Sequence, residues 1–374
     1  MRYYDLTIEN DGPGASLASG ASQMVRTLQP SATMPAVQQR RTAQARKPLL
    51  RYGSYVRRGL GEVTLGGPND EFDPGALDIA FTLGSMDQAV SAATKVTLHG
   101  VGAETVQRAA RLEGKFVTLR GGMGRGLPHS DPKTAGLLLR GVIITATGKA
   151  EGTAQYLELY INPILEPPAS TAITARARKG TSLQGALAMG LGQAYGKVRG
   201  YKPPTFLVAK DVETTMDVTV TGRKISEFAK QMARACRNEG VAPWTLYNMP
   251  DGSFLVTDGA KAQPHPVRTI KPDVLLGRPT MAGPGQMNFT TALRADIALN
   301  DLVLLAGGGA AETVNQGTVL KAFTGNPQPC GRHSNALAGQ WMVVGVEHVG
   351  HFRSTDGMQW ASTFTCRRAP PSAH

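Results

Sequence analysis

The stretch Leu276–Cys366 constrains the fold most, because it alternates between strand and turn patterns and shows no helical period. Its first part, LLGRPTMAGPGQMNFTTALRADIALNDLVLLAGG, is followed by a glycine-rich gap and then by WMVVGVEHVGHFRSTDGMQWASTFTC. Alternation of apolar and polar residues places one side of each strand in a core. The stretch therefore predicts an all-β unit. Its residue types suit assembly with other subunits rather than catalysis.

The N-terminal part of the chain also favours β structure. In Ala154–Ile161, for example, Leu157, Leu159 and Ile161 share one face of the predicted strand. The helical pattern of Gly102–Leu112 stops at Gly114. The predicted strands are Arg2–Ile8, Ala76–Leu83, Lys95–Gly100, Lys115–Arg120, Leu138–Thr147 and Ala154–Ile161.

A mixed α+β region separates the two β-rich parts. The proline-rich stretch Pro163–Pro168 breaks the strand pattern, and helices are predicted over Ser182–Tyr195 and Arg223–Asn238, the second with an apolar stripe. Trp244–Tyr247 and Ser253–Thr257 read as a hairpin. We therefore expect a mainly β protein with a mixed α+β middle, in which β-barrel domains at 1–165 and 273–374 flank a domain at 166–272.

Composition agrees with a β-rich protein of many turns. The 374 residues include 44 glycines and 24 prolines, and only 18% are charged. Cys236, Cys330 and Cys366 are odd in number and widely spaced, which argues against a disulfide framework and favours a reducing compartment. The sequence shows neither an apolar run of membrane-spanning length nor a secretory signal.

Positive charge is concentrated near the N-terminus. The net charge is +12, and the segment Gly12–Gly61 contains no Asp or Glu. Such a segment attracts acidic partners, and it is equally compatible with a solvated insertion, which we delimit as 12–72. Its basic residues are Arg26, Arg40, Arg41, Arg46, Lys47, Arg51, Arg57 and Arg58.

The most enzyme-like cluster is Glu347, His348 and His351. Zinc-binding histidines of the metalloprotease type lie four apart on a helix. Here they are three apart in a strand pattern, and an odd separation sends side chains to opposite faces. The pattern instead predicts that His348 ends a strand and His351 begins a turn.

Other chemical motifs are incomplete. Cys330 and His333 have no second ligand pair, and the loop Gly121–Gly126 lacks the spacing of phosphate-binding loops. Asp296 and Asp301 have no evident catalytic partner, and no nucleophile elbow occurs. Aromatic residues, at 6%, are too few for a base-stacking platform to be expected. We therefore predict no enzyme activity, no cofactor and no metal.

Four stretches, in one order along the chain, together resemble the baseplate hub proteins of long-tailed bacteriophages, the group related to the hub of contractile-tailed phages. The basic segment Gly12–Gly61 is not part of this pattern. The second stretch carries the order GGM, GLP, AGLL, and the last has the core HVGHFRSTDGMQW. The stretches are Met1–Ile8 with Pro74–Phe81, Phe116–Leu139, Leu276–Leu305 and Val344–Thr365.

The resemblance implies a homotrimer in which each subunit contributes two barrels like those of tail-tube subunits. Such a ring joins the sixfold tail tube, or a tube-initiator protein, to a threefold central spike. Its channel passes the tape measure protein and then DNA, and other baseplate proteins on the wedge or sheath side surround it. The implied location is the virion tail, after assembly in the host cytoplasm.

Contact residues and alternatives follow from this expectation. The loops Gly121–Pro132 and Ala306–Ala311 are either exposed turns or contact loops toward neighbouring subunits. We expect the basic segment to face outward or toward an acidic partner, because a basic channel would retain DNA. A tail-associated cell-wall hydrolase and a nucleic-acid-binding protein are the alternative functions. The candidate interface residues are Arg40, Arg41, Arg57, Arg58, Met123, Arg125 and Arg353.

Overall fold

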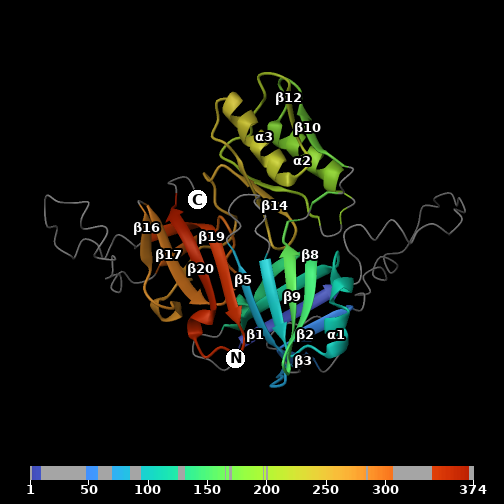
Figure 1. Ribbon diagram of the computed structural model, residues 1–374. Helices are drawn as coiled ribbons and strands as arrows, with labels where there is room; N and C mark the ends of the chain where they lie inside the picture. Colours follow the sequence, from blue (N-terminus) through green and yellow to red (C-terminus); the bar gives the residue numbers. More distant parts are fainter. Residues whose placement is uncertain are drawn as a thin grey trace, which may run out of the picture.

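The computed structural model describes residues 2–9, 48–57, 70–84, 94–124, 131–164, 166–167, 171–196, 198, 201–283, 285–305 and 339–369. Strands dominate this part of the chain, and thirteen of them form one mostly antiparallel sheet. The prediction of a mainly β fold with a mixed α+β middle is confirmed (Figure 1).

The N-terminal part of the large sheet runs in the order β5-β6-β9-β8-β7-β1-β2. Alternate residues of its strands enter one core, as the sequence pattern predicts: Leu157, Leu159 and Ile161 are fully buried together. Its strands are β1 (Arg2–Glu9), β2 (Leu50–Gly53), β5 (Asp78–Leu83), β6 (Thr94–His99), β7 (Phe116–Met123), β8 (Gly136–Glu151) and β9 (Ala154–Asn162). A separate pair consists of β3 (Tyr55–Arg57) and β4 (Asp70–Phe72).

The helix expected over Gly102–Leu112 forms as two short pieces that cover the N-terminal core. Helix α1 (Ala103–Gln107) ends at Arg108, whose backbone leaves the helical region, and the 3₁₀ turn η2 (Ala109–Leu112) follows. Ala109 and Leu112 are buried in the N-terminal core. Another 3₁₀ turn, η3 (Pro132–Thr134), precedes β8.

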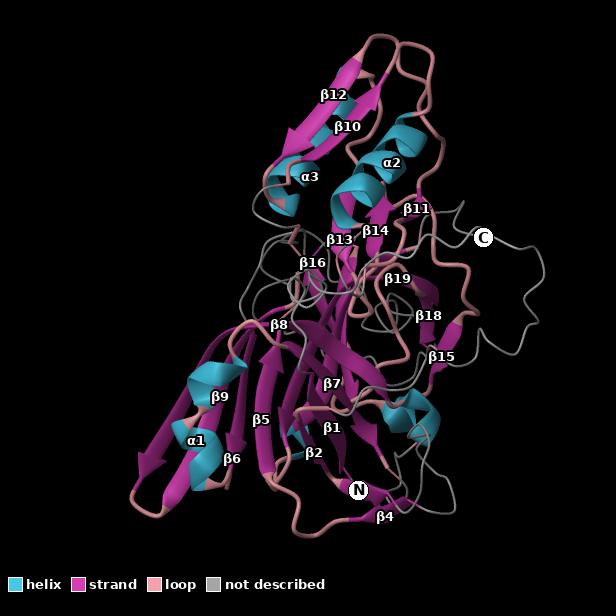
Figure 2. Cartoon of the chain, turned by 90° about the vertical axis from the view of Figure 1, so that its right-hand side faces the viewer, coloured by secondary structure: helices cyan, strands magenta, loops and turns pink. Residues whose placement is uncertain are grey.

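The middle region forms its own core between two helices and short strands (Figures 1 and 2). Ser182 caps the first helix by accepting a hydrogen bond from the Gly185 amide, and the apolar stripe of the second helix is buried. Strands β10 and β12 pair antiparallel, and β14 lies between β11 and β13. The elements are β10 (Ile173–Ala177), α2 (Leu183–Tyr195), β11 (Thr205–Leu207), β12 (Val218–Gly222), α3 (Ile225–Asn238), β13 (Thr245–Asn248) and β14 (Phe254–Thr257).

The C-terminal strands surround a third core that includes Phe289, Trp341 and Phe364. Strand β15 pairs in parallel with β18, so the C-terminal sheet takes in Arg268–Ile270, just before the expected domain start at 273. The elements are β15 (Arg268–Ile270), η4 (Pro272–Val274), β16 (Thr280–Gly283), β17 (Gln286–Ala292), β18 (Leu302–Leu305), β19 (Gly339–His351), η8 (Gly357–Gln359) and β20 (Trp360–Arg368).

One long strand, β19, joins the two β-rich parts. Its beginning pairs with β18, and its end, His348–His351, pairs with Leu83–Ala80 of β5, while β20 follows it along most of its length. The two parts are therefore hydrogen-bonded into one continuous sheet rather than linked only by loops. That the C-terminal unit superposes on the N-terminal one stays a prediction.

Candidate functional site

The two histidines of β19 contact different partners, as expected from strand parity. The Nδ1 atom of His348 lies 2.8 Å from Ser362 Oγ of β20, whereas Nε2 of His351 lies 3.0 Å from Asp78 Oδ2 of β5. Within the described residues, no group of three or more His, Cys, Asp or Glu side chains is placed to hold a metal ion. The two rings serve separate contacts within the sheet.

His348 is a buried, neutral group. Its backbone in β19 is paired with Ser362 of β20 and Leu83 of β5, and burial of the ring lowers the pKa of the imidazole to about 4. The ring is therefore uncharged at neutral pH and can either donate or accept through each nitrogen, depending on its tautomer.

Ser362 and His348 form a pair of the kind found in serine nucleophile sites, but their surroundings do not favour that chemistry. Ser362 is fully buried, its Oγ accepts a hydrogen bond from the Arg294 amide, and its hydroxyl faces the Arg294 carbonyl at 3.2 Å. A nucleophile must reach its substrate. The pair instead ties the segment after β17 to β19 and β20.

Two arginine side chains, Arg2 and Arg353, bond to or from the turn after β19, and we call these two residues the clasp. Arg2 donates from Nη1 to the carbonyl oxygens of His351 and Ser354, each at 2.6 Å, and its guanidinium lies 5.7 Å from the centre of the Trp360 ring. Arg353, which belongs to this turn, donates to the Ala76 carbonyl of the N-terminal part at 2.6 Å. Residues at opposite ends of the sequence thus hold the same turn.

Trp360 fills the core of the N-terminal sheet although it belongs to the C-terminal strand β20. Its ring packs against Phe81 with centroids 5.6 Å apart, and Phe352 lies on another side of it. A Cβ added to Gly350 would collide with the Phe81 ring, so glycine makes room for this packing. We call the contacts among β5, β7, β19, β20 and the turn 351–359 the junction.

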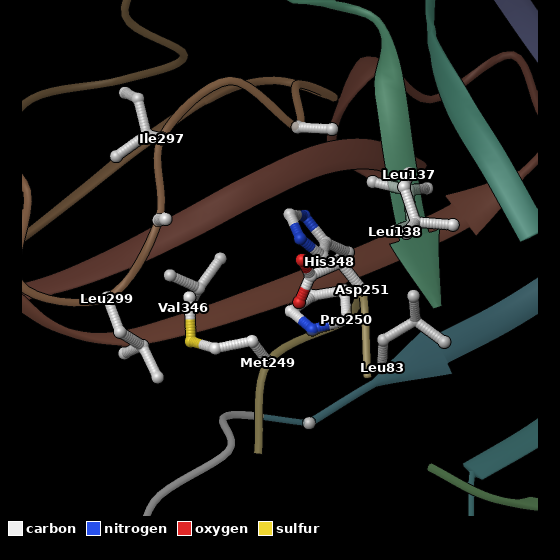
Figure 3. Close-up of a pocket in the computed structure, with 13 residues that line it drawn as sticks. Leu83, Leu137, Leu138, Met249, Pro250, Asp251, Ile297, Leu299, Val346 and His348 are labelled. Atoms are coloured by element: carbon white, nitrogen blue, oxygen red, sulfur yellow. The ribbon is translucent and has the colours of Figure 1, made fainter. Parts of the chain in front are cut away.

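A cavity of about 280 Å³ lies beside the junction, where all three parts of the chain meet. We call it the junction cavity, and Figure 3 shows its lining. The middle region contributes the turn between β13 and β14, and β5, β8, β19 and the segment 295–299 contribute the rest. It is lined by Leu83, Gly84, Leu137, Leu138, Met249, Pro250, Asp251, Ala295, Ile297, Ala298, Leu299, Val346 and His348.

The outer face of β6, β9 and β8 carries a cluster in which one carboxylate partly compensates two lysines. Glu158 accepts from Lys95 at 2.6 Å and from Lys149 at 3.0 Å, and its side chain is almost fully buried between them. The hydrogen bonds from Lys95 and then Lys149 lower the pKa of Glu158. Two lysines on this sheet face are thus paired with one carboxylate.

The predicted interface residues are not brought together in the described part of the chain. Met123 ends β7 with a buried side chain in the N-terminal core, and Arg353 belongs to the clasp. Arg57 lies in β3, where only its backbone is described. Arg40, Arg41, Arg58 and Arg125 lie outside the described residues, as do the glycine-rich stretch at 306–311 and the Cys330–His333 motif.

Part of the expected basic insertion belongs to the fold. Strand β2 pairs with β1, and Arg51 of β2 binds Asp5 through two hydrogen bonds of 3.0 and 2.7 Å. This arginine is therefore engaged within the chain rather than offered to an acidic partner. No local pattern in the sequence indicates the pairing, because 46 positions separate the two residues.

Comparison with known proteins gives structural neighbours only. No family model and no curated protein sequence matches the chain. Similar solved structures include the Escherichia coli c3393 protein, described as a type VI secretion component with structural similarity to T4 bacteriophage tail proteins gp27 and gp5. Its TM-score is 0.45, with 8% identity over 84% of this chain and 78% of that one.

Two further neighbours are tail proteins. The tail protein from Neisseria meningitidis has a TM-score of 0.44 and 9% identity, over 83% of this chain and 97% of that one. The 43 kDa tail protein of prophage MuSo2 from Shewanella oneidensis has a TM-score of 0.44 and 10% identity, over 83% and 98%. Among the described helices, none combines the length and hydrophobicity needed to cross a bilayer.

Proposed function

We propose that this protein is a structural hub of a phage tail baseplate or tail tip. In this role it is a homotrimer that joins the tail tube to the central spike and forms part of the channel for the tape measure protein and DNA. The observation that carries the proposal is the continuous sheet through β5 and β19, which fuses two β units in one subunit. The order of four sequence stretches that resemble such hubs supports it independently.

Fusion of the two units matters physically because a ring closes only when each subunit spans a fixed angle. A loop between two units leaves that angle free, whereas strand pairing at His348–His351 and the buried Trp360 fix it. Three such subunits would present six β units, which matches the step from a sixfold tube to a threefold spike.

Charge also supports a channel-lining subunit. A wall of unpaired lysines would bind DNA by releasing counterions and would oppose its passage. Lys95 and Lys149 are both paired with Glu158 on an exposed sheet face. We propose that this partly compensated face, rather than the basic segment near the N-terminus, lies toward the channel. The assembly to which the hub belongs would be the virion tail.

The proposal is tested on the purified full chain by light scattering and electron microscopy over a range of concentrations. We expect threefold rings with three times the chain mass of 39.6 kDa. An in-gel peptidoglycan assay tests the hydrolase alternative, and salt-dependent DNA binding tests the nucleic-acid alternative. A protein that remains monomeric throughout, or that degrades peptidoglycan, contradicts the hub function.

A further inference from the structure

The lining of the junction cavity is mostly apolar with a few polar groups, which is typical of small-molecule sites. Its walls are mostly aliphatic, with Leu138, Leu299 and Val346 coming from different elements. The carboxylate of Asp251, one of the lining residues, binds Lys202 Nζ at 2.7 Å and Ser253 Oγ at 2.7 Å. Because this acid is already paired, the cavity favours an uncharged occupant.

His348 supplies one directional contact in this apolar lining (Figure 3). Its Nδ1 is taken by Ser362, and the other ring nitrogen makes no hydrogen bond to the described part of the chain. When the Ser362 hydroxyl donates to the Arg294 carbonyl, His348 carries its proton on Nδ1 and Nε2 is an acceptor. When the hydroxyl donates to His348 Nδ1, the proton is on Nε2, which is then a donor. A hydroxyl group suits both tautomers, because it donates and accepts.

We propose that the junction cavity binds a small, uncharged, mainly apolar molecule through one hydroxyl group that hydrogen-bonds to Nε2 of His348. A cavity of roughly 150 Å³ with aliphatic and aromatic walls holds benzene. The junction cavity, at about 280 Å³, therefore has room for roughly ten non-hydrogen atoms. The proposal does not depend on the hub function, since the cavity lies within one subunit.

The ligand class is tested with three probes of similar size and different polarity: p-cresol, p-xylene and p-toluate. Binding to the full chain is followed by isothermal titration and by the imidazole resonances of His348. We expect p-cresol to bind two- to tenfold more tightly than p-xylene, which is the size of one net hydrogen bond. The carboxylate of p-toluate should prevent binding, because the site would desolvate it.

Two variants separate the cavity from nonspecific binding. Ala298→Phe fills the cavity from its wall and should abolish p-cresol binding, whereas Ala110→Phe makes the same change at an exposed position of η2 and should not. His348→Phe should bring p-cresol and p-xylene to equal affinity. The proposal is overturned if p-cresol does not bind the unmodified chain, or if Ala298→Phe and Ala110→Phe bind it equally.

Discussion

The indole Nε1 of Trp360 donates a buried hydrogen bond of 2.9 Å to the carbonyl oxygen of Gly122. The donor begins the last strand of the C-terminal sheet, and the acceptor lies in β7 of the N-terminal sheet, 238 positions earlier. The hydrogen bond fixes the orientation of the indole ring, which also packs against Phe81. Trp360 therefore contributes, together with strand pairing and the bonds of Arg2 and Arg353, to the relative placement of the two β units.

Replacing Trp360 with Phe should lower the free energy of unfolding by about 1–3 kcal/mol, since it removes one buried hydrogen bond and leaves part of the indole volume empty. The matched change is Trp244→Phe in the middle core, where no hydrogen bond of the indole is described. Denaturant titration followed by circular dichroism compares the two. Equal losses would mean that the bond to Gly122 contributes nothing.

Gly350→Ala tests the packing across β19 and β5. Gly350 is paired with Phe81, and a Cβ there would enter the Phe81 ring, which cannot move without displacing Trp360. Such overpacking costs about 1–3 kcal/mol, although alanine is otherwise the better strand residue. Gly357→Ala is the control, because nothing lies within 4 Å of a Cβ at Gly357. Thermal unfolding should separate them, and a Gly350→Ala chain as stable as the control would contradict this packing.

Local patterns in the sequence predicted most elements, because strand alternation and the helix stripe are local properties. The stripe of Ile225, Phe228 and Met232 is buried as expected, and the hairpin at 245–257 forms. The pairing of β19 with β5 was not predictable from such patterns, since any strand with one apolar face suits several partners. The junction cavity was missed for the same reason, because its walls come from three distant regions.

The glycines of the motif at 121–126 led to a wrong interpretation of their role. They indicated a loop, yet Gly121 and Gly122 lie inside β7. A Cβ at Gly122 would collide with the Ala135 backbone, and the φ of +155° there also favours glycine, whereas a Cβ at Gly121 would press on the end of the Leu138 side chain. Arg353 could not be assigned from sequence either, because its acceptors are backbone carbonyls, which every residue carries.

Gly259→Ala should loosen the middle region from β20. Gly259 has φ +76°, and a Cβ would occupy the position of the Arg367 guanidinium, which donates to the Gly259 carbonyl. Gly240, with φ +72° and an open environment, is the control. Both changes cost about 1–2 kcal/mol for the backbone conformation, but only the first also displaces the arginine. Limited proteolysis near 258–263 should be faster in Gly259→Ala alone. Equal rates in the two variants would show that Arg367 does not hold this segment to β20.

The protonation of His348 predicts a pH dependence of stability. Burial lowers the pKa of the folded imidazole from 6.5 to about 4, so between these values the unfolded chain binds a proton that the folded chain does not. The free energy of unfolding is therefore undiminished by this group above pH 6.5, and it falls as the pH is lowered from 6.5 toward 4. The loss is on the order of 3 kcal/mol, from about 1.4 kcal/mol for each pKa unit.

The measurement is the free energy of unfolding from denaturant titrations between pH 4 and 7. His348→Gln should remove this component of the slope, because glutamine does not titrate. Ser362→Ala should keep it, since burial and not the hydrogen bond to Ser362 depresses the pKa of His348. An unchanged slope in His348→Gln would show that the buried imidazole is not the group that links stability to pH. Loss of the slope in Ser362→Ala would assign the depressed pKa to the hydrogen bond instead.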